Sequence, residues 1–215
     1  FGAALYHESY FTLGRWILTA GLRLDYEGNL MNYCSDAAIH YCFLPTMTGS
    51  DGSRNWKRFE TLYKGKVRNH YFEVLPKVSA LYDCGNLGGL GSARAFAVVS
   101  KGYRSGGFNT QIFSDILQVK MMDGMMKDLG IKLDSAVGTT TYDTASATRY
   151  KPETSWNFEI GAHLTPVAGL NIDASLFWIE CFDQQVTVLP KGNNTGRMMS
   201  NAARARSYGV ELSAK

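Results

Sequence analysis

The chain has 215 residues, of which 19% are charged, and its formal net charge is +3. It contains no run of roughly 18 consecutive apolar residues, which excludes an ordinary membrane-spanning helix. The 22 glycines and 12 tyrosines are typical of a β-rich protein.

Apolar and polar residues alternate along several segments, as expected of strands with one apolar and one polar face. Trp16, Leu18 and Leu22 share one face of the segment 16–28, whereas Arg23 and Asp25 share the other. A β-sandwich strand would show the same alternation. The pattern predicts seven strands, at about 2–11, 16–28, 69–83, 93–103, 151–165, 169–188 and 198–213.

The connections between these strands alternate between short and long, which is typical of an up-and-down outer-membrane barrel. The two longest connections, about 29–68 and 104–150, are expected to be external loops, since long unstructured connections are rare in compact domains. We therefore predict an all-β, antiparallel transmembrane β-barrel fragment that spans residues 1–215 as a single partial domain.

The chain begins at Phe1 without an initiator methionine or a signal segment, so a processed product or an excised piece is expected. Bacterial single-chain barrels have an even number of strands, from eight upward. Seven strands predict a piece whose open edges favour aggregation in isolation.

The segment 51–70 is the most basic part of the chain, with six cations and two anions. Trp56 and Arg58 lie in it and are candidate ligand contacts. An external cationic loop would attract an anionic ferric chelate or the phosphates of lipopolysaccharide, although such a loop is also commonly just solvated. Interleaved aromatic and basic residues also suit nucleic acid, but a surface-exposed loop argues against such a partner.

Cys34 and Cys42 lie in the first predicted external loop, where an oxidising environment would allow a disulfide. With His40 they would give three ligands to a metal, one fewer than a structural zinc site needs, so no metal site is predicted. The four histidines show no catalytic spacing. We therefore expect neither a cofactor nor an enzyme.

Helical spacing of apolar residues predicts a short helix at 114–129, capped by Ser114 or Asp115 and ended by Gly130. Its methionines resemble a soft-metal site, but thioethers more often provide an adaptable packing surface. That surface would contact a plug domain or a partner lipoprotein.

Several stretches resemble TonB-dependent outer-membrane receptors, in the order in which that family carries them. They are Leu18–Tyr26, Ser100–Asn109, Tyr150–Gly161, Asn201-Ala202 and Ser207–Leu212. The resemblance implies the C-terminal part of a 22-stranded barrel, without its plug, its TonB-binding peptide or its last strand or strands.

The resemblance implies an outer-membrane receptor of a Gram-negative bacterium that imports a scarce nutrient, most often a ferric siderophore, with energy from the TonB complex. Tyr103 and Arg104, at the top of the strand in Ser100–Asn109, join Trp56 and Arg58 as candidate ligand contacts. The expected partners are outer-membrane lipid and lipopolysaccharide, the plug and TonB. The fragment alone should not transport.

Three alternatives remain open at this stage. A plugless diffusion porin shares the alternation and the loop rhythm, and an esterase barrel would in addition need a nucleophile with a base beside it. A soluble β-sandwich would bury the apolar face in a dry core.

Overall fold

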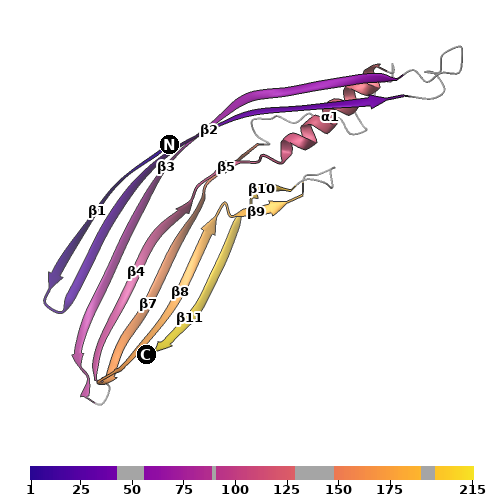
Figure 1. Ribbon diagram of the computed structural model, residues 1–215. Helices are drawn as coiled ribbons and strands as arrows, with labels where there is room; N and C mark the ends of the chain where they lie inside the picture. Colours follow the sequence, from indigo (N-terminus) through magenta and orange to yellow (C-terminus); the bar gives the residue numbers. More distant parts are fainter. Residues whose placement is uncertain (43–55, 89–90, 129–147, 190–196) are drawn as a thin grey trace, which may run out of the picture.

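A single antiparallel sheet of seven strands dominates the computed structural model, which describes residues 1–42, 56–88, 91–128, 148–189 and 197–215 (Figure 1). The spatial order of the strands follows the chain, as in an up-and-down barrel wall. The prediction of seven antiparallel strands is confirmed. The strands are β1 (Gly2–Leu13), β2 (Trp16–Tyr41), β3 (Lys57–Asn86), β4 (Ser92–Arg104), β7 (Glu153–Val167), β8 (Leu170–Phe182) and β11 (Arg204–Ala214).

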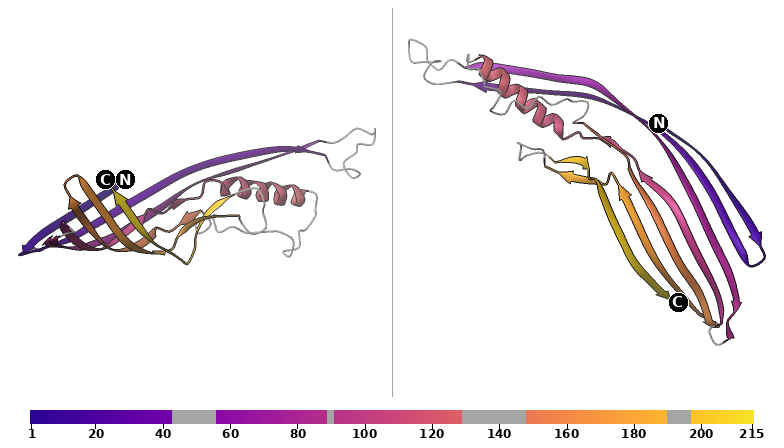
Figure 2. Two further views of the ribbon diagram at one scale, coloured as in Figure 1. Left: turned by 90° about the horizontal axis from the view of Figure 1, so that it is seen from below. Right: turned by 180° about the vertical axis from the view of Figure 1, so that it is seen from behind.

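The strand register places apolar side chains in rows across one face of the sheet. Paired residues of antiparallel strands point to the same face. One such row runs through Ala97, Ile160, Leu176 and Val210. Ile160 is 57% exposed and Val210 72% exposed, and no second sheet among the described residues covers this apolar face (Figure 2). The described residues therefore do not form a β-sandwich.

Polar side chains occupy the opposite face of the same strands. Asp25 pairs in register with Glu73, and Gly21 pairs with Lys77, whose ammonium lies 3.1 Å from Glu8. This polar face and the apolar face are the two surfaces that the period-two pattern predicted.

The long connections lead into smaller elements at one end of the sheet, shown at the top of Figure 1. The connection from β4 to β7 contains a helix and a two-stranded sheet, and the connection from β8 to β11 contains another two-stranded sheet. These elements are β5 (Gly107–Phe108), α1 (Ile112–Asp128), β6 (Arg149–Tyr150), β9 (Gln185–Val188) and β10 (Met198–Asn201). None of the described helices has the length and apolar character needed to cross a bilayer.

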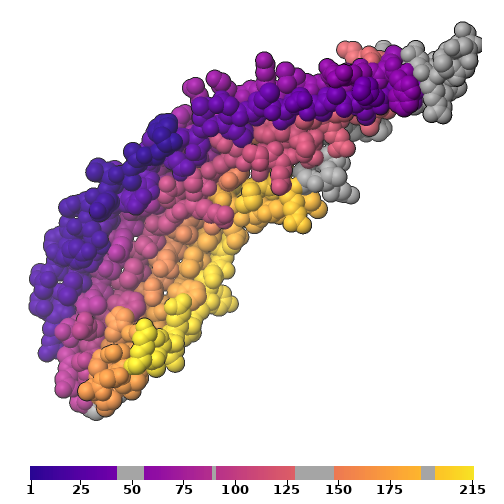
Figure 3. Space-filling model, in the orientation of Figure 1, coloured from indigo at the N-terminus to yellow at the C-terminus, as the bar shows by residue number. Residues whose placement is uncertain are grey.

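The segment expected to be a loop at 29–68 is largely a β-hairpin. Pairing of β2 with β3 continues without a register shift from Asn29 and Asn69 out to Tyr41 and Lys57. Figure 3 shows this hairpin extension reaching beyond the other strands. The extension is stable as strand because α1 packs against one of its faces, a contact that the local sequence does not reveal.

The small hydrophobic core lies between α1 and the hairpin extension, not beneath the sheet. Ile112, Phe113 and Ile116 are almost fully buried, and Met31, Tyr33, Tyr63 and Met198 pack around them. The helix therefore joins the hairpin extension to β10, which carries Met198.

The boundaries of α1 differ from the predicted ones at the N-terminus. The helix begins at Ile112, so Ser114 and Asp115 lie in its first turn and do not cap it. The Ser114 hydroxyl instead donates to the Gln111 carbonyl at 2.7 Å. Gly130, the predicted stop, lies outside the described residues.

Two predicted strands are each divided in two. The segment 169–188 breaks at Asp183, which has a positive φ of 52°, and continues as β9. Aspartate tolerates this left-handed conformation better than most residues. The segment 198–213 forms β10 and then β11.

The four cysteines are free thiols. Cys34 lies within β2 and Cys42 directly follows that strand, so about 26 Å of extended backbone separates them. A disulfide requires Cα atoms within about 7 Å. The bridge expected between these cysteines therefore does not form in this structure.

Candidate functional surface at the strand tops

The strand tops are the ends of β2, β3, β4, β7 and β8 from which the long connections leave (Figure 1). Above them lie α1, β5, β6, β9 and β10, which we call the loop assembly. Three amide side chains connect segments of the loop assembly to one another or to the strand tops.

The side-chain amides of Asn109 and Asn201 each form two hydrogen bonds with the backbone N–H and carbonyl of one distant residue. The Asn109 amide donates to the Met199 carbonyl at 2.9 Å and accepts from the Met199 N–H at 2.7 Å. Asn201 does the same with Lys151, at 3.0 and 2.8 Å. Both asparagines belong to stretches that carry the family resemblance, and their role here is structural.

Gln185 connects three chain segments from a largely buried position. Its Nε2 donates to the carbonyls of Ser105 at 2.8 Å and Lys151 at 3.2 Å. Its backbone N–H donates to Glu153 Oε2 at 2.7 Å. Since buried polar groups are costly unless satisfied, these bonds fix the positions of β4, β6 and β9 relative to one another.

Gly106 is required for space. A Cβ there would lie 2.5 Å from both the Tyr150 carbonyl oxygen and the Tyr71 hydroxyl. Neither Gly106 nor Gly107 has a positive φ, so no left-handed turn requires a glycine at either position. Close approach of the backbone to Tyr71 therefore explains this glycine.

Helix α1 lies along the face of the hairpin extension that continues the polar face. Phe113 stacks on Tyr33 at 4.5 Å between ring centroids, and Lys120 Nζ lies 4.2 Å from the centre of the Tyr63 ring. A Cβ on Gly124 would collide with the Phe59 ring. The helix thus depends on a glycine where it approaches the hairpin most closely.

Two tyrosines of the hairpin extension have raised pKa values. A hydrogen bond with Tyr63, with burial as the smaller cause, raises the pKa of Tyr33. Burial, followed by the hydrogen bond to Asp128 at 3.1 Å, raises the pKa of Tyr41. Both phenols therefore remain neutral at physiological pH.

Charged side chains on the polar face form pairs just below the loop assembly. Arg23 Nε lies 2.8 Å from Asp25 Oδ1, and Lys101 Nζ lies 3.0 Å from Glu73 Oε2. A depression of about 400 Å³ opens beside the first pair. Its lining residues include Arg23, Asp25, Glu27, Asn29 and Tyr103.

The structure separates the four predicted ligand contacts into two places. Tyr103 lines the depression, and Arg104 follows it, exposed at the top of β4. Trp56, 61% exposed, and Arg58, ion-paired with Glu60, lie at the far end of the hairpin extension, about 50 Å farther along the sheet. One small ligand cannot contact all four.

Glu27 and Ser105 also belong to this surface but were not predicted as site residues. The Ser105 hydroxyl donates to Glu27 Oε2 at 2.6 Å, and Asn29 donates to the other carboxylate oxygen at 3.0 Å. The period-two pattern places Glu27 on the same face as Arg23 and Asp25, and this pattern could have indicated Glu27 as a site residue. Within the described ranges, no three His, Cys, Asp or Glu side chains are grouped to hold a metal ion.

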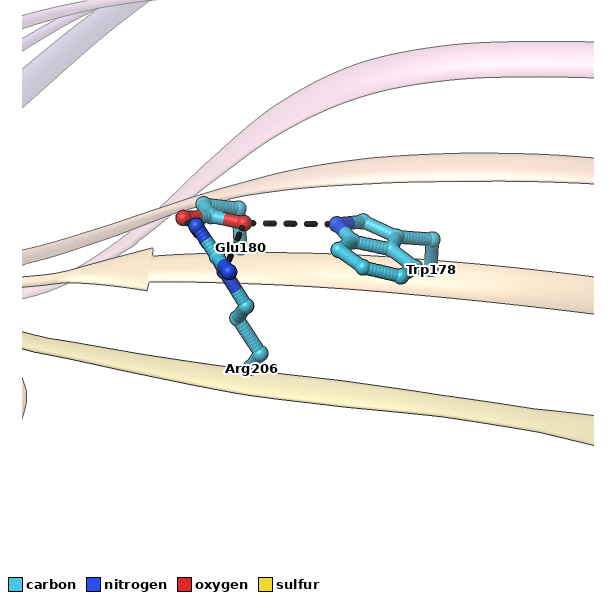
Figure 4. A network of polar contacts seen from close by, with 3 residues as sticks. All are labelled: Trp178, Glu180 and Arg206. Carbon is cyan, nitrogen blue, oxygen red and sulfur yellow. Dashed lines mark hydrogen bonds and ion pairs between the residues drawn. The ribbon is translucent and has the colours of Figure 1, made fainter.

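The apolar face ends toward the strand tops in an aromatic and charged cluster (Figure 4). Trp178 stacks on Tyr208 at 5.5 Å and donates its indole N–H to Glu180 at 3.3 Å. Arg206 donates its Nε–H to both oxygens of Glu180, at 3.1 and 3.0 Å. Aromatic rings followed by charges are typical of a strand leaving the hydrocarbon region.

Comparison with known proteins agrees with this architecture. The ferric yersiniabactin uptake receptor FyuA from Yersinia pestis superimposes with a TM-score of 0.57 and 20% identity, covering 99% of this chain and 23% of that one. A double mutant of the Serratia marcescens hemophore receptor HasR, in complex with its hemophore HasA and heme, superimposes with a TM-score of 0.55 and 12% identity. This match covers 99% of this chain and 31% of that one. The chain thus spans under a third of either receptor.

A search of curated proteins found no match. The family model described as "TonB dependent receptor-like, beta-barrel" matches residues 2–215, which is nearly the whole chain. The chain therefore belongs to the TonB-dependent receptor β-barrel family, a family of Gram-negative outer-membrane receptors and transporters.

Proposed function

We propose that the complete protein is an outer-membrane receptor that imports a ferric siderophore with energy delivered through TonB, and that this chain supplies part of the barrel wall and of the external loops. The observation that carries the proposal is a seven-stranded sheet with one uncovered apolar face and a loop assembly at one end, in a member of this family. The chain alone is not a transporter.

The charge distribution at the strand tops supports an anionic ligand. Asp25 and Glu73 are already paired with Arg23 and Lys101. Arg104 is exposed and forms no ion pair with any described residue, so its guanidinium is available to a carboxylate or catecholate oxygen. The name of FyuA indicates that this fold serves uptake of a ferric chelate in one relative.

The remaining partners follow from the two faces of the sheet. The polar face would contact the plug domain, which engages TonB, and the apolar face would contact outer-membrane lipid. Met122, 48% exposed on α1, would contact a surface lipoprotein. These assignments, and the location of this protein in the outer membrane, are part of the proposal.

Replacing Tyr103 and Arg104 by alanine in the complete receptor tests the site. We expect affinity for ferric yersiniabactin or a ferric catecholate, whichever the intact receptor binds, to fall about tenfold, since an Arg–anion contact contributes roughly 1.5 to 3 kcal/mol. Binding is measured by quenching of intrinsic fluorescence. Arg94→Ala, at the other end of β4, is the control.

The variant Trp56→Ala/Arg58→Ala tests the distant pair separately. This end of the hairpin would attract the chelate before it docks, so the association rate and its salt dependence should fall while the dissociation rate stays unchanged. If the Tyr103 and Arg104 variant binds that chelate like the intact receptor, or if uptake persists without TonB, the proposed function is wrong.

A further inference from the structure

A hollow in the apolar face is lined in part by Trp178, which also belongs to the cluster in Figure 4. It has a volume of about 420 Å³ and is almost wholly apolar. The large side chains around it are Val99, Phe158, Ile160, Leu176 and Trp178. They come from three neighbouring strands, so the hollow is part of the wall and not of a loop.

Small residues explain why the face is hollow at this place. Ala97 lies in the row of Ile160 and Leu176, and its short side chain leaves space beside Ile160. The next row away from the strand tops runs through Ala95, Ala162 and Ala174. A groove of this size and lining fits a hydrocarbon chain lying along the wall.

Arg206 at the upper end of this groove retains unused hydrogen-bond donors. Glu180 accepts only from its Nε–H, and neither terminal amino group donates a hydrogen bond to a described residue. The guanidinium lies 5.9 Å from the centre of the Trp178 ring, and the Arg206 side chain is 59% exposed. Glu180 and Trp178 thereby hold the guanidinium in place, and its two terminal amino groups retain donors for a ligand.

Arg204 adds a second cation on the same face, two residues along β11. Its guanidinium lies 4.9 Å from the centre of the Phe182 ring, and it forms no ion pair within the described chain. Two arginines held over aromatic rings, beside one carboxylate, leave a net positive charge. Free guanidinium forks bind phosphate in a bidentate manner.

We propose that this groove and the two arginines form a fixed binding site for one lipopolysaccharide molecule. An acyl chain would occupy the groove, and a phosphate of the lipid headgroup would bind the free forks of Arg206 and Arg204. The long connections leave from this end of the sheet, and the lipid of that leaflet carries the required phosphates. The inference rests on the proposed placement of the chain in an outer-membrane wall.

The test uses the complete receptor, extracted in mild detergent, with bound lipid measured by native mass spectrometry. The first variant combines Arg204→Gln, Arg206→Gln and Glu180→Gln. Replacing Glu180 as well avoids leaving its carboxylate without a partner. We expect about tenfold less lipopolysaccharide per receptor. Arg94→Gln removes the same kind of charge from the polar face and should retain the lipid.

A second variant fills the groove without changing any charge. Ala97→Leu should also reduce retained lipopolysaccharide, whereas Ala20→Leu, on the apolar face of β2, should not. A heat-modifiable gel shift shows whether the charge-neutralised receptor folds. If it does not fold, the comparison of Ala97→Leu with Ala20→Leu still tests the lipid site.

Retention of lipopolysaccharide by the folded variants, or a glycerophospholipid as the bound species, overturns the inference. The outcome is separable from the proposed function, because chelate binding is measured on the same preparations. A receptor that binds its chelate normally but never retains lipopolysaccharide would reject this lipid site alone.

Discussion

Asn201 shows how one side chain can position a whole loop. Its amide bonds the Lys151 N–H and carbonyl and also donates to the Asp183 carbonyl at 2.8 Å. Asn201→Ala should lower the free energy of local opening around β9 and β10 by about 2 kcal/mol, since several hydrogen bonds are lost together. Amide hydrogen exchange in Gln185–Val188 and Met198–Asn201 would then be about 30-fold faster.

The matched control is Asn32→Ala, because Asn32 is exposed on β2 and its side chain makes no hydrogen bond to another described residue. Exchange in β9 and β10 should not change in that variant. Equal protection from hydrogen exchange in the Asn201 variant and the intact receptor would show that the Asn201 hydrogen bonds do not hold β9 and β10 in place.

The hairpin extension and α1 stabilise each other as elements. A side chain at Gly124 would collide with the Phe59 ring. Gly124→Val should therefore release α1, and hydrogen exchange should show loss of protection in Ile112–Asp128 with no change in β7 or β8. Asp123→Val, exposed beside it, is the control for helix propensity. Retained protection in the Gly124 variant would contradict the docking.

These two elements also show what the sequence could and could not predict. The transmembrane parts of the strands were predictable because lipid on one face and polar surroundings on the other require apolar and polar residues to alternate along the strand. Beyond Tyr26 that selection ends: the outward positions Leu30, Asn32 and Cys34 have mixed polarity. The strand continues there only because α1, distant in sequence, covers Met31 and Tyr33.

The candidate site was predictable only in part, for the same reason. Tyr103 could be predicted because it lies in a recognisable strand end. The amide contacts of Asn109, Gln185 and Asn201 join segments up to 90 residues apart, so no local pattern indicates them. Trp56 and Arg58 were grouped with Tyr103 because an external loop was expected at 29–68, whereas the paired hairpin places them far from Tyr103.

At the scale of the whole molecule, the described sheet is an arc whose edge strands, β1 and β11, each pair with one neighbour. An open edge in hydrocarbon leaves backbone N–H and C=O groups unsatisfied, at several kcal/mol each. The arc is therefore expected to act within a closed wall, consistent with its covering 23% and 31% of the two receptors it resembles.

The central claim is that lipid contacts the apolar face of this arc and not the polar face. Chemical unfolding of the complete receptor in lipid vesicles, comparing Ile160→Arg with Asn157→Arg, tests it most directly, because the two residues lie on opposite faces of β7. The Ile160 variant should lose about 2 to 4 kcal/mol of stability and the Asn157 variant less than about 1 kcal/mol. Equal losses, or a larger loss at Asn157, would contradict the account.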